Sequence, residues 1–194
     1  MKLLRLLSPL KKLLAVVIVI TLLLLGLDKL YGFVMLKIYP RDYSEYVEKY
    51  CEEYEVEPNF AYAFIKCESN FDKNAESKAG AKGLMQLTDE TFSYLSERVT
   101  GAPLEPEKIT DPELNIRFGI YYISYLSEKF EGDKALIIAA YNAGPSKVTE
   151  WLNNEKYSPD GKNIKTYPYE ETKNHIEKVL SAEEKYKELY EKEQ

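Results

Sequence analysis

One carboxylate stands out because of the residues on either side of it. Glu68 ends the mostly apolar run Phe60–Cys67, and a segment of small residues that contains Gly80 and Gly83 follows it. Apolar neighbours desolvate a carboxyl group, which favours its protonated form. A protonated carboxyl group can act as a general acid, for example toward the oxygen of a glycosidic bond. Considered alone, a glutamate in this place is more commonly a solvent-facing residue at a helix end, so its interpretation depends on the other motifs of the chain.

The other residue types weaken several alternative chemistries. The chain has one histidine, His175, in the charged stretch Lys-Asn-His-Ile-Glu, which is typical of a helix surface rather than a catalytic site. A Ser-His-Asp or Cys-His group would need that residue, and zinc would need more His or Cys ligands. Gly80 and Gly83 are not followed by Gly-Lys-Ser/Thr, and no calcium-loop spacing occurs. We therefore expect no metal and no cofactor, and a site that depends on carboxylates.

The beginning of the chain has the composition of a membrane segment. Leu13–Leu27 contains no charged residue, and the mostly apolar Leu30–Leu36 follows it. No small-x-small cleavage pattern and no lipid-accepting cysteine come after the run. A single uncleaved membrane anchor over residues 13–36 is therefore favoured over a removed signal peptide. The basic residues before it, which include Lys2 and Arg5, predict that the rest of the chain lies outside the cytoplasm.

Charge separates the anchor from the remainder of the chain. Residues 1–40 hold six basic residues and one acidic residue, a net charge of +5, and the total of −6 leaves −11 for residues 41–194. An acidic domain argues against nucleic acid as a partner, because phosphate binding needs a basic surface. A neutral sugar polymer is not excluded. We expect a membrane anchor with a short connector over residues 1–40 and one domain over residues 41–194.

Hydrophobic spacing in that domain predicts helices and no strand of any length. The expected helices cover residues 44–54, 60–67, 89–97, 112–130, 134–142, 146–151 and 170–191. Thr88 and Asp111 are expected N-caps, and Pro112 fits the first helical position. Lys134–Asn142 is apolar nearly all round, which indicates a buried central helix. The expected fold class is mainly α. Whether Cys51 and Cys67 form a disulfide or are two buried thiols stays open at this point.

Short motifs follow one another in order between Glu68 and Ile176. They are the segments Glu68–Phe71, Ala75–Leu87, Asp111–Tyr122, Ala140–Gly144 and Pro168–Thr172. Taken together they resemble the lytic transglycosylases of the soluble-lytic-transglycosylase (SLT) type, which share a lysozyme-like fold. The chain departs from that family at Lys73, at Thr88-Asp89, and at His175, where the family usually has a tyrosine.

The resemblance implies cleavage of the β-1,4 bond between N-acetylmuramic acid and N-acetylglucosamine in peptidoglycan glycan strands. Glu68 would be the catalytic residue, acting first as acid and then as base on the 6-hydroxyl of the sugar, which gives a 1,6-anhydro product. By matched position the substrate-binding residues would be Ser77, Gln86, Tyr141, Asn142 and Glu171. Ser77 and Gln86 would hydrogen-bond the substrate. Glu171 would be a second carboxylate that binds substrate rather than a nucleophile.

Other functions stay open from the sequence alone. A goose-type-lysozyme-like hydrolase would cut the same bond with water. A membrane-tethered wall-binding protein would keep the fold without depending on catalysis, and a purely structural helical domain would have no ligand. The location implied by the transglycosylase interpretation is the cell membrane, crossed once, with the catalytic domain outside the cytoplasm. The biological setting and any partners in cell-wall or secretion machinery are not indicated.

Overall fold

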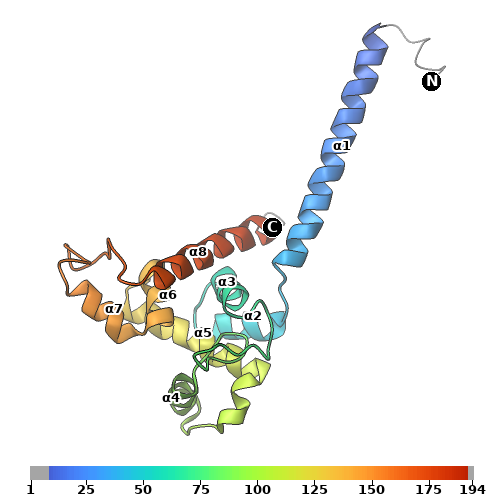
Figure 1. Cartoon of the computed structure of the whole chain (residues 1–194). Helices are drawn as coiled ribbons and strands as arrows, with labels where there is room; N and C mark the ends of the chain where they lie inside the picture. The colour runs from blue at the N-terminus through green and yellow to red at the C-terminus, as the bar shows by residue number, and fades with distance from the viewer. Residues whose placement is uncertain (1–8, 192–194) are drawn as a thin grey trace. The chain divides into compact units, whose positions relative to one another are not determined.

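The structure, a computed structural model, describes residues 9–191, and every regular element within that range is a helix (Figure 1). The chain divides into two compact units, residues 1–40 and 41–194. The expected mainly α fold class is confirmed. The helices are α1 (Pro9–Ile38), α2 (Ser44–Glu53), α3 (Pro58–Glu68), α4 (Asp89–Thr100), the 3-10 helix η2 (Pro106–Thr110), α5 (Pro112–Lys129), α6 (Lys134–Ala143), α7 (Pro145–Leu152) and α8 (Glu170–Tyr190).

In the part of the first unit that the structure describes, residues 9–40, the one helix is α1. The two apolar runs expected from the sequence belong to this one helix of 30 residues, which continues through Asp28 and Lys29. At 1.5 Å per residue it is about 45 Å long, more than the roughly 30 Å hydrocarbon thickness of a bilayer. Its segment Lys11–Ile38 is long and apolar enough to cross a membrane, judged by length and composition. Lys2 and Arg5 of the positive flank lie outside the described residues.

Local capping explains where several helices of the second unit begin. The side chains of Thr88 and Asp111 accept hydrogen bonds from the backbone N–H groups three residues on, at 3.2 Å and 3.0 Å, which confirms both expected N-caps. The helix expected over residues 60–67, with Pro58 near its start, begins at Pro58. The carboxylate of Glu57 caps it by accepting from the N–H groups of Asn59 and Phe60.

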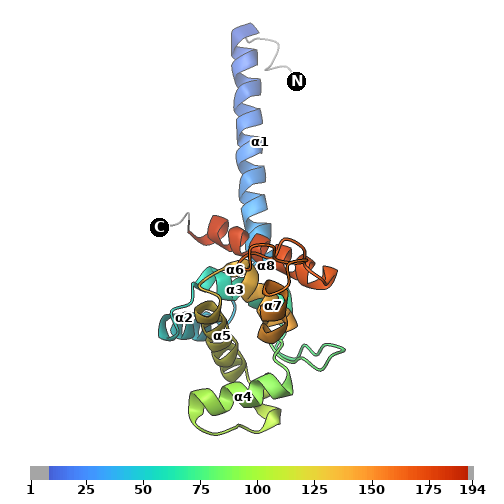
Figure 2. The same ribbon diagram turned by 90° about the vertical axis from the view of Figure 1, so that its left-hand side faces the viewer.

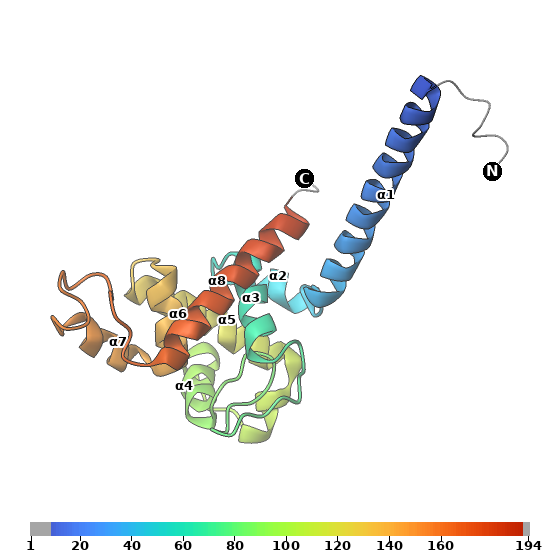
Figure 3. The same cartoon turned by 45° about the horizontal axis from the view of Figure 1, so that its top comes forward.

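Two helices share the centre of this unit. The expected burial of α6 is found over Leu136–Ala140, and α3 is equally buried over Asn59–Ile65. The contact between α8 and α3 is the most extensive contact between any two helices of the unit, and α8 also contacts α6 (Figure 3). The residue that ends α3 is thus presented by a helix that cannot shift without disturbing most of the core.

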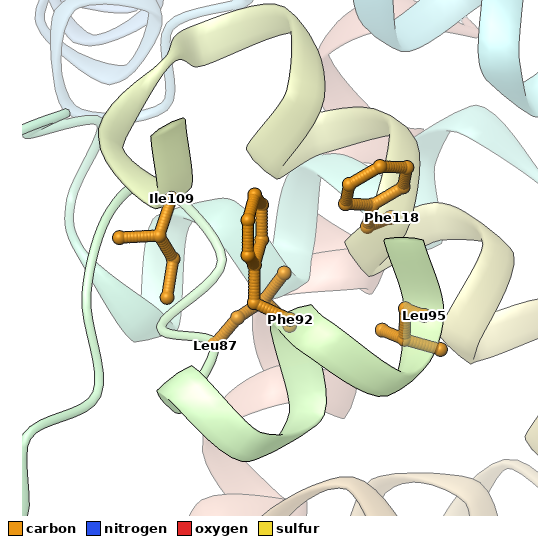
Figure 4. Close-up of a cluster of buried hydrophobic side chains, with 5 residues drawn as sticks. All are labelled: Leu87, Phe92, Leu95, Ile109 and Phe118. Atoms are coloured by element: carbon orange, nitrogen blue, oxygen red, sulfur yellow. The ribbon is translucent and has the colours of Figure 1, made fainter. Parts of the chain in front are cut away.

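A second apolar cluster stabilises the part of the unit that contains α4 and η2. It joins α4, α5 and η2 to the end of the long loop between α3 and α4 (Figures 2 and 4). Its members, all at most 2% exposed, are Leu87, Phe92, Leu95, Ile109 and Phe118. Because Leu87 is the last residue of the loop before the cap of α4, this cluster anchors one end of the loop.

Two smaller features complete the second unit. Trp151, in the last turn of α7, packs edge-on against Tyr167 and Tyr169 of the segment that leads to α8, with ring centroids 6.5 Å and 5.6 Å away. Cys51 and Cys67 are free thiols in the structure rather than a disulfide; Cys51 is buried and Cys67 is partly buried. Burial raises the pKa of Cys67 to about 11, so this thiol is mostly protonated at neutral pH.

Candidate functional site

Glu68 is the last residue of α3, and its side chain is 15% exposed. The chain turns sharply behind it, because Asn70 and Phe71 both take left-handed backbone angles, with φ of 52° and 65°. The hydroxyl of Ser69 donates to the carbonyl oxygen of Leu84 at 2.8 Å. The carboxylate is therefore placed where the end of a buried helix meets the loop that follows it.

A buried asparagine from α5 determines the shape of that loop. The amide oxygen of Asn115 accepts from the N–H of Met85 at 2.7 Å, and its Nδ2 donates to the carbonyl oxygens of Ile109 and Lys82 at 2.7 Å and 3.1 Å. Gly83, with φ of +80°, lies so close to this amide that a Cβ atom would collide with it. Asn115 belongs to one of the short motifs of the sequence, which predicts no role for it; the structure identifies it as the residue that braces the loop.

Ser77 and Gln86, two of the expected substrate-binding residues, make their described contacts within the loop. The hydroxyl oxygen of Ser77 accepts from the N–H of Ala81 at 3.0 Å. Nε2 of Gln86 donates to the carbonyl oxygens of Ala75 and Gly83 at 3.1 Å and 3.0 Å, and the backbone of Gln86 is left-handed. Both side chains thus stabilise the loop conformation in the structure.

Tyr141, on α6, connects the loop to the core near Glu68. Its hydroxyl donates to the carbonyl oxygen of Met85 at 2.8 Å, and its ring packs against Phe64 and Tyr122 at centroid distances of 4.8 Å and 5.2 Å. Burial raises the pKa of Tyr141 well above its ordinary value, and the negative charge of Glu68 adds to the effect. Tyr141 therefore stays a neutral hydrogen-bond donor and lies within electrostatic reach of Glu68.

Asn142 and Glu171 lie where α6 meets the beginning of α8. The amide oxygen of Asn142 accepts from the hydroxyl of Thr172 at 2.8 Å, although the side chain is otherwise exposed. Glu171 is exposed in the first turn of α8. Of the five expected substrate-binding residues, these two are at the α6–α8 junction, while Ser77 and Gln86 shape the loop.

The expectation that His175 lies on a helix surface is wrong. Its side chain is 13% exposed, and its Nε2 atom lies 3.1 Å from Oε1 of Glu68. The reason is the register of α8. His175 is three residues after the buried Thr172 and four before the buried Val179, so it shares their inward face. That spacing was present in the sequence, and it was masked by the charged residues on both sides of the histidine.

Within residues 9–191, no group of three or more His, Cys, Asp or Glu side chains is arranged so that it could hold a metal ion. The chemistry available at the site is that of one carboxyl group, one imidazole and several neutral donors.

Comparison with known proteins places this geometry in context. The family model described as "Transglycosylase SLT domain" matches residues 45–164. The soluble lytic murein transglycosylase of Escherichia coli (strain K12) is 30% identical over 152 residues, which are 77% of this chain and 23% of the relative. The membrane-bound lytic murein transglycosylase C of Actinobacillus pleuropneumoniae is 28% identical over 172 residues, 78% of this chain and 47% of the relative. The chain thus spans between about a quarter and a half of the length of these relatives.

Solved structures show the same similarity. An inactive mutant of the lytic transglycosylase Slt from Pseudomonas aeruginosa, in which a glutamate is replaced by glutamine, matches with a TM-score of 0.68 and 32% identity over 77% of this chain and 24% of that one. The 70 kDa soluble lytic transglycosylase of Escherichia coli matches with a TM-score of 0.70 and 27% identity, and covers 79% of this chain and 25% of that one. The complex of the 70 kDa soluble lytic transglycosylase with bulgecin A matches with a TM-score of 0.70 and 26% identity.

Proposed function

Because the chain belongs to the transglycosylase SLT domain family and has its lysozyme-like fold, we propose that it is a membrane-anchored lytic transglycosylase of peptidoglycan. Its reaction is non-hydrolytic cleavage of the β-1,4 bond between N-acetylmuramic acid and N-acetylglucosamine. The products are a new N-acetylglucosamine end and a 1,6-anhydro-N-acetylmuramic acid end.

In this proposal Glu68 serves both halves of the reaction. Its carboxyl proton passes to the glycosidic oxygen as the bond from the muramic anomeric carbon to that oxygen breaks, and the bonding electrons leave with the oxygen. The 6-hydroxyl oxygen of the same sugar then bonds to the anomeric carbon, and its proton passes to the Glu68 carboxylate. One carboxyl group completes the cycle and recovers its proton, so no second carboxylate is required.

The observation that carries the proposal is the placement of Glu68. Its carboxylate is largely withdrawn from water at the end of a buried helix, and in the described part of the chain it forms no ion pair with a lysine or an arginine. A nearby permanent cation would favour the ionised carboxylate and disable the acid. That the related Pseudomonas protein was made inactive by a glutamate-to-glutamine change is consistent with a catalytic glutamate in this family.

The remaining expected residues receive supporting roles. Ser77 and Gln86 hold the loop beside Glu68 and present their remaining hydrogen-bonding atoms to the sugar. Tyr141 holds the loop in a fixed position relative to Glu68 through its bond to the carbonyl oxygen of Met85. Asn142 and Glu171 contact the glycan from the α6–α8 junction.

The N-terminal unit gives the proposed location. α1 anchors the protein in the cell membrane by a single crossing, and the basic flank before it stays in the cytoplasm. Residues 41–194 then form the catalytic domain on the outer side, where the wall polymer is found. The similarity to a membrane-bound lytic murein transglycosylase supports the anchoring.

Glu68→Gln tests the function directly. The full chain in detergent, incubated with purified sacculi, should release anhydro-muropeptides, and the variant should release at least about a thousandfold less while its circular dichroism is unchanged. The matched control is Glu52→Gln, which changes an exposed glutamate of α2 and should retain full activity. Equal product from Glu68→Gln and the wild type would remove Glu68 from the mechanism.

Mass spectrometry of the same digests separates the proposal from hydrolysis. An anhydro sugar is lighter than the hydrolytic product by one water, so reducing-end muramic acid in place of the anhydro form would favour the goose-type-lysozyme-like alternative. Binding to sacculi without any cleavage would favour the non-catalytic wall-binding protein.

A further inference from the structure

The contact between His175 and Glu68 has no place in the mechanism above. The Nε2 atom of His175 is fully buried and lies 3.1 Å from Oε1 of Glu68, yet the contact falls outside hydrogen-bond geometry. In the described residues Nε2 has no other hydrogen-bond partner. A buried polar atom without a partner is costly, and a small rotation of either side chain would complete a hydrogen bond with Glu68.

The charged and titratable groups around this pair come from three helices. α3 contributes Lys66 and Cys67 beside Glu68, and Cys67 is close enough to interact electrostatically with Glu68 and with Lys178 of α8. α8 also carries Glu171 one turn before His175. α6 contributes the neutral Tyr141. Of these groups, His175 is the one whose described ion-pair contact is with Glu68.

We propose that His175 is a positioning residue for Glu68, whose Nε2–H donates to Oε1 of Glu68 and leaves the other carboxyl oxygen to exchange its proton with the substrate. The proposal rests on the proposed function. The hydrogen bond fixes the plane of the carboxyl group and stabilises the carboxylate that forms when the proton leaves. The imidazole transfers no proton of its own, so the proton balance of the reaction is unchanged.

The proposal has a consequence for pH. Imidazole takes up a second proton between about pH 5 and 8 and becomes a cation. A cation beside Glu68 favours the ionised carboxylate, so fewer molecules hold the proton that the first step needs. Activity supported by His175 should therefore decline as the pH falls through that range, relative to a variant whose side chain cannot be charged.

The kinetic test compares His175→Leu and His175→Gln with the wild-type full chain acting on soluble glycan strands. His175→Leu removes the donor and should lower kcat at least tenfold with KM unchanged, whereas His175→Gln keeps an amide donor and should recover part of that loss. The ratio of wild-type kcat/KM to that of His175→Gln should be at least threefold smaller at pH 5 than at pH 8. Asn174→Gln, at an exposed position of the same helix, is the matched control.

A second measurement does not depend on activity. The protein has one histidine, so without affinity histidines its imidazole NMR signals belong to His175. Glu68→Gln should change the chemical shifts of these ring signals at constant pH, because the carboxylate beside Nε2 is replaced by an amide, whereas Glu52→Gln should leave them unchanged. Unchanged ring shifts in Glu68→Gln, wild-type kcat in His175→Leu, or a pH-independent ratio would each overturn the proposal. If the wild type released no anhydro product while the ring shifts still changed, the proposed function would fail and the pairing would stand.

Discussion

The two segments that flank Glu68 are built by opposite means. The loop over residues 72–88 is held by polar side chains that bond to backbone groups, chiefly Asn115, Gln86 and Tyr141. α8 is held chiefly by an apolar stripe that packs on α3, with one buried ion-pair cluster at Glu183 toward its far end. A loop of this kind depends on each bond individually, whereas a packed helix positions whichever residue occupies its inward face.

That difference explains where the chain can vary. A substitution in the polar frame of the loop removes a partner from a buried group, so the loop tolerates few changes. A substitution on the inward face of α8 keeps the helix and changes the chemistry offered to Glu68. His175, where the family resemblance noted from the sequence predicts a tyrosine, would be a change of this second kind. Substitutions in each segment test whether the distinction holds.

The largest effect is expected from Asn115→Leu, which removes the brace of the loop. Leucine leaves the N–H of Met85 and the carbonyl oxygen of Ile109 without their described side-chain partner in a buried place, while the carbonyl oxygen of Lys82 keeps the N–H of Leu87 at 3.1 Å. At about 1–3 kcal/mol for each unsatisfied group, partly relieved by water, the free energy of unfolding should fall by about 4 kcal/mol. Urea unfolding of the full chain in detergent, followed by near-UV circular dichroism, measures it. A loss below about 1 kcal/mol would show that the loop does not depend on this residue.

A smaller loss is expected from Glu183→Gln, at the far end of α8. The carboxylate of Glu183 is buried and accepts from Lys134 and Lys187. Burial raises the pKa of Glu183, but the hydrogen bonds from the two lysines outweigh it and hold the pKa below its ordinary value. The substitution should cost about 2 kcal/mol at pH 7, since both lysines reach solvent and Gln retains a carbonyl acceptor.

The cost of Glu183→Gln should also depend on pH. Because the pKa of the folded state is depressed, the stabilisation is present above the unfolded value of about 4.3 and is lost as the pH falls through the folded value. The difference in unfolding free energy between wild type and variant should therefore shrink from pH 6 to pH 3. Glu177→Gln, which makes the same charge change at an exposed position of α8, is the matched control; a difference that grew toward pH 3 would contradict the ion pairing.

A still smaller effect is expected from Tyr141→Phe, which keeps the ring and removes one bond between α6 and the loop. The free energy of unfolding should fall by about 1.5 kcal/mol, because the carbonyl oxygen of Met85 loses its described donor. Release of anhydro-muropeptides should also fall, and by more than the small increase in the unfolded fraction accounts for, because the loop beside Glu68 loses its bond to α6. Full activity in a destabilised Tyr141→Phe variant would show that catalysis does not depend on the bond between Tyr141 and the loop.

The smallest effect is expected from Thr172→Val, which keeps the shape of a buried side chain on α8. It removes the hydrogen bond from Thr172 to Asn142 and leaves the apolar contacts of the helix in place. Because Asn142 is exposed and can bond to water, the cost should be about 0.5–1 kcal/mol by urea unfolding. A cost similar to that of Asn115→Leu would mean that α8, like the loop, depends on single polar bonds.

Features of the fold could be predicted from the sequence where neighbouring residues in the chain determine them. Thr88 and Asp111 were predictable as N-caps because a cap acts within its own first turn. The cap of α3 was not predicted, because Glu57 acts as the cap and glutamate is not among the preferred capping residues. The role of Asn115 and the partnership of His175 with Glu68 depend on how distant segments meet, and no short pattern states that. Motif resemblance identified the loop residues, but it could not tell a substrate contact from a bond that shapes the loop.

The position of Trp151 has a consequence for observing this protein at work. It is the one tryptophan of the chain, and Tyr167 and Tyr169 touch its ring from the segment that leads into α8. Excitation absorbed by such close tyrosines passes to the indole, so the emission colour and intensity of the unlabelled protein report whether this segment is seated on α7. A glycan strand that displaces the segment would register as a fluorescence change, and binding could be timed in a stopped-flow instrument before any bond is cut.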